Sequence, residues 1–268
     1  MHLIINTRPL NTSAGLHKAL QNIELCTVQL PAMAIAGSSQ PQLVAKQLQA
    51  ARHDDVWIFT SINAVEQTFL LLAETAARQS DWPIMAILGK GSRQALQHCL
   101  QQLAVSGVNI IAPPAGSTHN SEGLLQHPVL QQVDGKRILL LNAPHGRDKL
   151  LQALQQRGAR VHELAVYRRV AAKLASNTLQ TIATWPDDLL TLWTSSASIR
   201  FLQQQFAAAA SSDDHIGQLW QRIIHGRHLV LSAAQRQLLQ QLDAVTISMA
   251  DAPDNTSLAR QLQALAMA

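Results

Sequence analysis

The chain has 268 residues, of which 47% are hydrophobic and 14% charged, and its formal net charge at pH 7 is +4. This length predicts two domains or one large one, and the apolar content excludes an intrinsically disordered chain. The basic residues are scattered, which speaks against a nucleic-acid partner and favours a small anionic ligand. No run of about 18 apolar residues and no signal-peptide pattern occurs, so we expect a cytoplasmic protein without a membrane span.

Motifs for metals and cofactors are missing from the sequence. Cys26 and Cys99 form no CxxC pair, and the histidines form no HExxH pair, so we expect reduced thiols and no metal site. The segment Gly89–Arg93 follows a predicted strand, but Gln94 stands where a dinucleotide fingerprint needs its third glycine. The same segment lacks the glycine and hydroxyl spacing of a P-loop, so we expect no nucleotide cofactor.

Short apolar runs alternate with longer amphipathic runs. The first third of the chain predicts strands over 3–5, 25–30 and 56–59, a helix over about 14–22 with Ser13 as its N-cap, and a helix over about 64–78. Further along the chain, the pattern predicts strands over 84–88, 108–111, 137–141 and 161–168. It also predicts a helix from 89 to about 102, a helix starting at Ser121, and a helix over 147–157 closed by Gly158. Buried strands separated by single helices indicate parallel βαβ units.

A weak internal repeat divides the chain. Val56–Val65 resembles Leu190–Ile199, because both read as a strand that ends in Thr-Ser at a helix start. The shared spacing of about 61 residues to the next matching helix start predicts two similar α/β halves, although any two βαβ segments resemble each other to some degree. Since the repeat begins only near residue 56, we expect the N-terminal strands to join the C-terminal half.

This organisation predicts a discontinuous first domain of residues 1–34 and 172–268 and a second domain of residues 35–171. Linker strands are expected near 31–37 and 164–172. The chain would then cross twice between the domains, which predicts a hinge over a cleft.

Candidate ligand-binding residues stand at the ends of predicted strands. The turns Thr60-Ser61 and Thr194-Ser195 lie where α/β sheets collect ligands, and their hydroxyls and N–H groups suit carboxylates and phosphates. Helix capping alone also explains such turns. The start of the helix after Gly89 is a weaker candidate for an anion site.

Two further residues have chemistry that suits a binding site. Arg147 opens a predicted helix and can grip a carboxylate with two parallel hydrogen bonds, although a surface salt bridge explains it equally well. Tyr167 is the single tyrosine of the chain, and its hydroxyl can both donate and accept. A packing role for this side chain is the alternative.

Taken in order, the motifs resemble the uroporphyrinogen-III synthase family. They are Thr7-Arg8-Pro9, Phe59–Val65, Leu88–Ser92, Ser121–Leu125, Gly146-Arg147 and Val166–Arg169. The resemblance implies two parallel-sheet, flavodoxin-like α/β domains joined by a two-stranded linker, with the active site in the cleft between them. It also implies a cofactor-free, monomeric lyase of heme biosynthesis that cyclises hydroxymethylbilane with inversion of ring D.

The resemblance also assigns roles to residues. It makes Tyr167 the group that assists loss of the substrate hydroxyl. It implies substrate-binding roles for Arg8, Thr60, Ser61, Asn63, Ser92, Ser121, Arg147, Thr194 and Ser195. The family often has a Gly-x-Thr-Thr or Gly-x-Thr-Ala turn where this chain has Ser232–Gln235, which leaves an inactive homologue as one alternative. A non-catalytic two-domain protein that binds a small ligand is the other.

Overall fold

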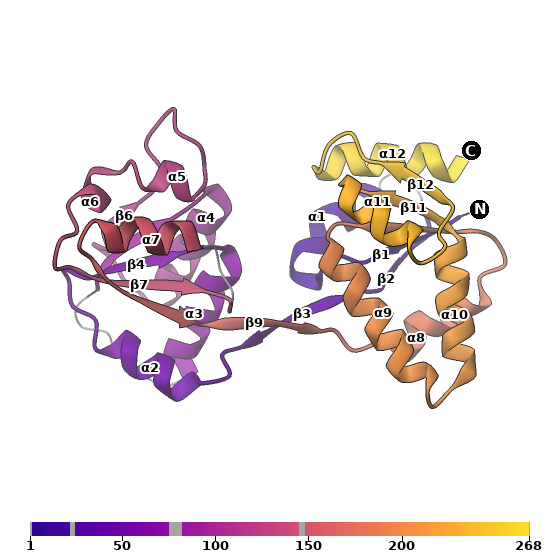
Figure 1. The fold of residues 1–268 in the computed structure, drawn as a ribbon, viewed down its shortest axis with the longest axis horizontal. Coiled ribbons are helices and arrows are strands. Elements are labelled where there is room, and N and C mark those ends of the chain that lie inside the picture. Colours follow the sequence, from indigo (N-terminus) through magenta and orange to yellow (C-terminus); the bar gives the residue numbers. More distant parts are fainter. Residues whose placement is uncertain (1, 22–24, 75–81, 145–147, 268) are drawn as a thin grey trace. The chain divides into compact units, whose positions relative to one another are not determined.

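The computed structural model describes residues 2–21, 25–74, 82–144 and 148–267. The chain divides into two compact units (Figure 1). Unit 1 consists of Met1–Ala34 and Val170–Ala268, and unit 2 of Ile35–Arg169. No helix in the described ranges is long and apolar enough to cross a membrane.

Unit 2 is built on a five-stranded parallel sheet. Its order is β6-β5-β4-β7-β8. The strands are β4 (Val56–Phe59), β5 (Ile84–Ile87), β6 (Ile110–Ile111), β7 (Arg137–Asn142) and β8 (Arg160–Ala165). All four residues of β4 are buried, because helices cover both faces of the sheet and a central strand has no solvent side.

Alternate residues of β4 supply two hydrophobic cores. Trp57 and Phe59 pack on one face, which is covered by α2 (Pro41–Gln49), α3 (Ile62–Glu74) and α4 (Lys90–Gln102). Val56 and Ile58 pack on the other face, which is covered by α5 (Ser121–Leu124), α6 (Pro128–Gln131) and α7 (Asp148–Gln156). This alternation follows from the two-residue period of a strand.

Unit 1 has a sheet of the same kind, in the order β12-β11-β10-β1-β2. Its strands are β1 (Leu3–Asn6), β2 (Thr27–Gln29), β10 (Leu189–Trp193), β11 (Arg227–Val230) and β12 (Thr246–Met249). One face is covered by α1 (Leu10–Gln21) and α12 (Asn255–Met267). The other is covered by α8 (Ser176–Thr184), α9 (Ser196–Ala210), α10 (Asp214–His225) and α11 (Ala233–Gln240).

The two sheets share one spatial arrangement but differ in where the chain enters it. Counted along the chain, the strands of unit 1 lie in the order 2-1-3-4-5, which is the flavodoxin-like order, and those of unit 2 in the order 3-2-1-4-5. Strands β4 and β10 therefore occupy equivalent places, as do β7 and β1. The two units are therefore similar α/β units, and their strand orders are related by a circular permutation.

Two strands carry the chain between the units. β3 (Met33–Gly37) leads into unit 2 and β9 (Tyr167–Ala171) leads out of it, and the two pair in a two-stranded sheet (Figure 1). The single strand predicted over 161–168 is wrong. Val166 separates β8 from β9, because its N–H makes the last bond to β7, at the carbonyl of Asn142, before the chain leaves the sheet.

Two predicted helix caps are also corrected. Helix α1 begins at Leu10, directly after Pro9, and Ser13 lies inside it with its hydroxyl donating to the Leu10 carbonyl over 2.9 Å. Proline is favoured at helix starts because its missing N–H is not needed there. Helix α5 is capped by Asn120 rather than Ser121, since the Asn120 side chain accepts the N–H of Gly123.

Candidate functional site

A cavity of about 710 Å³ opens where the strands of unit 2 end. We call it the Tyr167 cavity. Its walls are formed by the segments after β4, β5 and β7, by the starts of α3, α4 and α5, and by β9. Strand order reverses between β4 and β7, and this is the place where open α/β sheets bind ligands. Five of the predicted site residues line the cavity: Thr60, Ser61, Ser92, Ser121 and Tyr167.

The hydroxyls of Ser61 and Tyr167 meet in this cavity. Ser61 Oγ accepts the N–H of Ala64 over 3.1 Å, which caps the first turn of α3. The same oxygen lies 3.1 Å from Tyr167 Oη. The tyrosine is only 2% exposed, and its ring belongs to the core that β4 and α3 share. Core packing and one hydrogen bond therefore fix the position of the phenol.

The start of α4 forms another wall. Gly89 is its N-cap residue and supplies no side-chain cap, and Gly89, Gly91 and Ser92 of this uncapped helix start line the cavity. Ser92, 7% exposed, adds a hydroxyl in the same turn. A Cβ on Gly91 would lie 2.9 Å from Ile62 Cδ1, so this glycine makes room for the isoleucine across the opening. Such a helix start favours a carboxylate.

Thr60 has a structural bond of its own. Its hydroxyl and its N–H each lie 3.2 Å from the carbonyl of Leu141, so the residue ties the end of β4 to the end of β7. The other predicted residue of this turn, Asn63, lies in the first turn of α3 and does not line the cavity. Arg147 lies outside the described residues.

Sequence reasoning missed four polar residues that line the cavity. They are His119, Asn120, Asn142 and Arg169. Arg169 is the one arginine or lysine among the described residues that line it, and it lies two positions after Tyr167 on β9, which places both side chains on one face of the strand. Asn142 directly follows the strand predicted over 137–141, so the strand-end rule used for Thr60 could have found it.

The predicted residues of unit 1 lie at the equivalent edge of its own sheet. The Arg8 guanidinium donates to Asn255 Oδ1 over 2.6 Å and to the Pro253 carbonyl over 3.2 Å, and partial burial lowers its pKa. Ser195 Oγ caps α9 by accepting the N–H of Ser198 over 3.1 Å, and Thr194 directly precedes it. These three predicted residues do not line the Tyr167 cavity.

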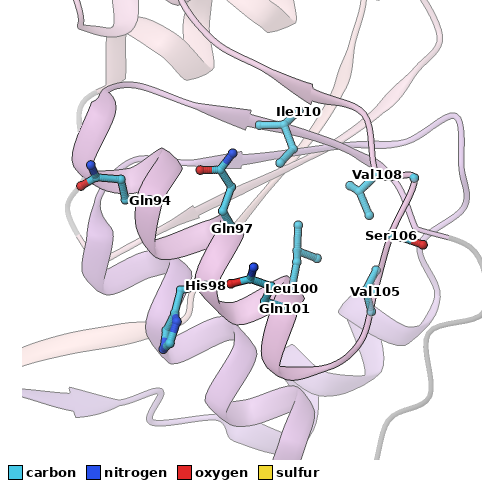
Figure 2. A pocket seen from close by; sticks show the side chains of 10 residues that line it. Gln94, Gln97, His98, Leu100, Gln101, Val105, Ser106, Val108 and Ile110 are labelled. Atoms are coloured by element: carbon cyan, nitrogen blue, oxygen red, sulfur yellow. The ribbon is translucent and has the colours of Figure 1, made fainter.

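A second hollow of unit 2 has different chemistry. It measures about 590 Å³ and lies between α4 and the segment that leads into β6. Figure 2 shows Gln94, Gln97, His98 and Gln101 along the helix, opposite Val105 and Val108. It shares no lining residue with the Tyr167 cavity and has no lysine, arginine or tyrosine. Of these two hollows, the Tyr167 cavity is the one whose described lining includes a guanidinium.

The fold and the Tyr167 cavity define a class: a protein of two α/β units with a strand-end cavity of hydroxyl, amide and guanidinium groups around a single fixed phenol. In the part of the chain that the structure describes, no three His, Cys, Asp or Glu side chains are placed to hold a metal ion. The family model described as uroporphyrinogen-III synthase HemD matches residues 15–222. The chain therefore belongs to the uroporphyrinogen-III synthase family.

Individual relatives agree with this family. The uroporphyrinogen-III synthase of Escherichia coli (strain K12) is 27% identical, covering 97% of this chain and 99% of its own. That of Proteus mirabilis is 30% identical, covering 62% of this chain and 80% of its own. Solved structures of the enzymes from Helicobacter pylori and Thermus thermophilus align with TM-scores of 0.52 and 0.51, each at 14% identity. Both alignments cover 100% of this chain, together with 100% of the Helicobacter pylori chain and 99% of the Thermus thermophilus chain. These alignments show a shared fold.

Proposed function

We propose that the Tyr167 cavity is where this chain, as a uroporphyrinogen-III synthase, acts on hydroxymethylbilane and cyclises it with inversion of ring D. One observation carries the proposal. The single tyrosine of the chain is fixed by the core and by Ser61 in a cavity at the switch point of the sheet. A phenol in such a place can donate to a leaving hydroxyl with little loss of conformational freedom.

Either hydroxyl of the Ser61–Tyr167 pair can donate to the other, and we propose that Ser61 is the donor. A serine hydroxyl has one proton and two lone pairs, and one lone pair of Ser61 accepts the N–H of Ala64. When Ser61 donates its proton to Tyr167 Oη, the phenolic proton is left for a group in the cavity. Ser61 then also stabilises the negative charge that grows on the phenolic oxygen as its proton moves.

This arrangement supports loss of water from ring A of the substrate. The C–O bond breaks with its electron pair on the oxygen, and that oxygen takes the proton of Tyr167 and leaves as water. The ring left behind is an azafulvene-like cation. The substituted carbon of ring D attacks it, the resulting spiro intermediate fragments, and the rearranged pyrrole closes the macrocycle. The ring carbon that forms this last bond then loses its proton, which balances the proton given by Tyr167.

Positioning is the main task of the remaining groups. The substrate is reactive and rich in carboxylates, so the enzyme must hold a flexible chain in one conformation. We assign the carboxylate contacts to Arg169, to Ser92 and to the N–H groups at the start of α4. A guanidinium and a helix start both suit carboxylates, the first by paired hydrogen bonds and the second by its dipole.

The deciding experiment measures the isomer formed from hydroxymethylbilane. The protein should give the type III isomer, whereas the protein-free control gives type I. Formation of type I alone in both would reject the activity and favour an inactive homologue. Tight binding of hydroxymethylbilane without turnover would favour a non-catalytic binding protein.

Tyr167→Phe tests the proposed acid. It removes only the hydroxyl and keeps the ring in the core, so we expect turnover to fall by about a hundredfold or more while the thermal unfolding temperature stays within a few degrees. Unchanged turnover would remove Tyr167 from the chemistry.

We further propose that the protein acts as a monomer in the cytoplasm, without a cofactor. Both cysteines are free thiols, which fits a reducing compartment. Sedimentation equilibrium should give the mass of one chain, 29.2 kDa. A dimer mass at micromolar concentration would contradict the monomer.

A further inference from the structure

Asn142 occupies a special position in the Tyr167 cavity. It is the last residue of β7, it lines the cavity, and it is only 5% exposed. Its backbone carbonyl accepts the N–H of Val166, the residue directly before Tyr167. The amide is therefore held close to the strand that carries the phenol.

The neighbouring strand fixes which way the amide faces. Asn142 Nδ2 donates to Glu163 Oε1 of β8 over 3.0 Å. An ionised carboxylate can only accept, so it selects the nitrogen of the amide. The Asn142 oxygen is then directed away from Glu163.

An asparagine at the end of the corresponding strand of unit 1 uses its oxygen differently. Asn6 ends β1, and its carbonyl accepts the N–H of Leu30 as that of Asn142 accepts Val166. The Asn6 side-chain oxygen accepts the N–H of Arg8, two residues later. Two residues after Asn142 stands Pro144, which has no N–H. The local donor that occupies the oxygen in unit 1 is thus absent in unit 2.

An amide oxygen in this cavity suits one part of the substrate. The N–H of a pyrrole can only donate, and Arg169 can only donate as well, so a pyrrole needs an acceptor such as this oxygen. Loss of the hydroxyl makes ring A cationic, which makes its N–H a stronger donor. We propose that the side-chain oxygen of Asn142, aimed by Glu163, accepts the N–H of the ring that becomes cationic and so stabilises the transition state of water loss.

This inference rests on the proposed function and assigns two new roles. Asn142 is a catalytic residue because it touches the reacting ring, and Glu163 is a positioning residue because it acts through Asn142. A contact that strengthens only as charge develops lowers the barrier without tightening substrate binding equally. Its loss therefore reduces kcat more than it raises KM.

The test uses Asn142→Leu, which keeps the approximate size and removes the acceptor. We expect kcat for the type III isomer to fall by about tenfold or more, with KM changed less than threefold. A folded Asn142→Leu protein with kcat within twofold of the wild type would overturn the inference.

Variants of Glu163 decide the question even where Asn142→Leu does not fold, because Glu163 is exposed. Glu163→Ala removes the group that aims the amide and should lower kcat several-fold. Glu163→Gln keeps an oxygen that can accept the same N–H and should restore most of kcat. Glu66→Ala, which removes an exposed carboxylate of α3 outside the cavity, is the matched control and should behave as the wild type.

The outcomes separate the two proposals. If the wild type gives type I isomer only, the proposed function fails and this inference fails with it. If the wild type gives type III and Glu163→Ala has the kcat of the Glu66→Ala control, the inference alone is overturned. A loss in Glu163→Ala that Glu163→Gln repairs supports it.

Discussion

The side-chain oxygen of Ser61 makes two hydrogen bonds. It caps α3 through the N–H of Ala64 and it contacts the phenol of Tyr167. A capping role alone changes stability, whereas contact with the phenol also changes chemistry. The two roles can therefore be separated by comparison with a cap elsewhere in the chain.

Ser61→Ala should lower both stability and turnover. Loss of the cap costs about 1 kcal/mol of unfolding free energy, and loss of the bond to Tyr167 should lower kcat about tenfold. Asp213→Ala is the control, because Asp213 caps α10 by accepting the N–H of His215 over 3.0 Å. It should cost similar stability, measured by urea unfolding, with kcat unchanged. Equal kcat in the two variants would leave Ser61 a cap only.

At the scale of elements, the loop before α11 differs from the family turn but is internally complete. Ser232 Oγ accepts the N–H of Gln235 over 3.4 Å, and Gln235 Oε1 accepts the N–H of Leu231 over 2.7 Å. This reciprocal pattern resembles a capping box, but the Gln235 side chain bonds the residue before the N-cap instead of the N-cap residue itself. The loop lacks the hydroxyls that the family turn would supply. Its Leu231 N–H is bonded to the Gln235 side chain of the same chain.

Gln235 should therefore matter for stability. It is 4% exposed, and Gln235→Ala would leave the Leu231 N–H without its acceptor, at a cost of about 1–2 kcal/mol of unfolding free energy. Gln235→Glu keeps the acceptor and should retain most of that stability. Both variants should keep the kcat of the wild type per folded molecule. A fall in kcat without a fall in unfolding free energy would show instead that this loop contacts substrate.

The sequence predicts elements best where one pattern has one explanation. The run 56–59 is apolar throughout and is the buried strand β4. Ser13 failed as a cap because a serine in the first turn of a helix can also donate to a carbonyl behind it, as it does to Leu10. The break at Val166 was missed because β8 and β9 are both extended, so the strand pattern continues while the chain changes sheets.

The same limit applies to the site. Thr60, Ser61 and Ser92 were predicted because each stands beside a recognisable strand end or helix start. The role of Asn142 depends on Glu163 in the next strand and on Pro144, and that combination has meaning only once strand neighbours are known. The place of Arg169 in the cavity could not be predicted either, because it depends on β9 being a strand separate from β8.

At the scale of the molecule, permutation sets the order in which the units can form. Unit 2 is one continuous segment, so its sheet can close from contacts within that segment. In unit 1, β1 pairs with β10, with Leu3 opposite Leu189, so its sheet needs both ends of the chain. Because distant contacts form more slowly, unit 2 should fold first. Each unit has its own hydrophobic cores, so the stability of each unit can respond separately to pH.

His228 gives unit 1 a dependence on pH. The ring is 1% exposed, its Nδ1 accepts from Trp193 Nε1 over 3.0 Å, and its Nε2 donates to the Ile224 carbonyl over 2.9 Å. Burial lowers its pKa, so the folded state takes up a proton less readily than the unfolded state. The folded unit therefore keeps its stability above the ordinary histidine pKa of about 6.5 and loses it as pH falls below that value.

The tryptophans allow this loss to be followed in each unit. Trp185, Trp193 and Trp220 lie in unit 1, and Trp57 and Trp82 in unit 2. With 5-fluorotryptophan incorporated, fluorine NMR can follow the urea unfolding of each unit. Between about pH 7.5 and about pH 5.5, the urea midpoint of unit 1 should fall more than that of unit 2. The extra loss of unfolding free energy should be at most about 1.4 kcal/mol per pH unit. His228→Gln can accept and donate at the same two positions without titrating, so it should remove the extra fall. An equal shift in both units, or an extra fall that persists in His228→Gln, would show that another group controls the acid response of unit 1.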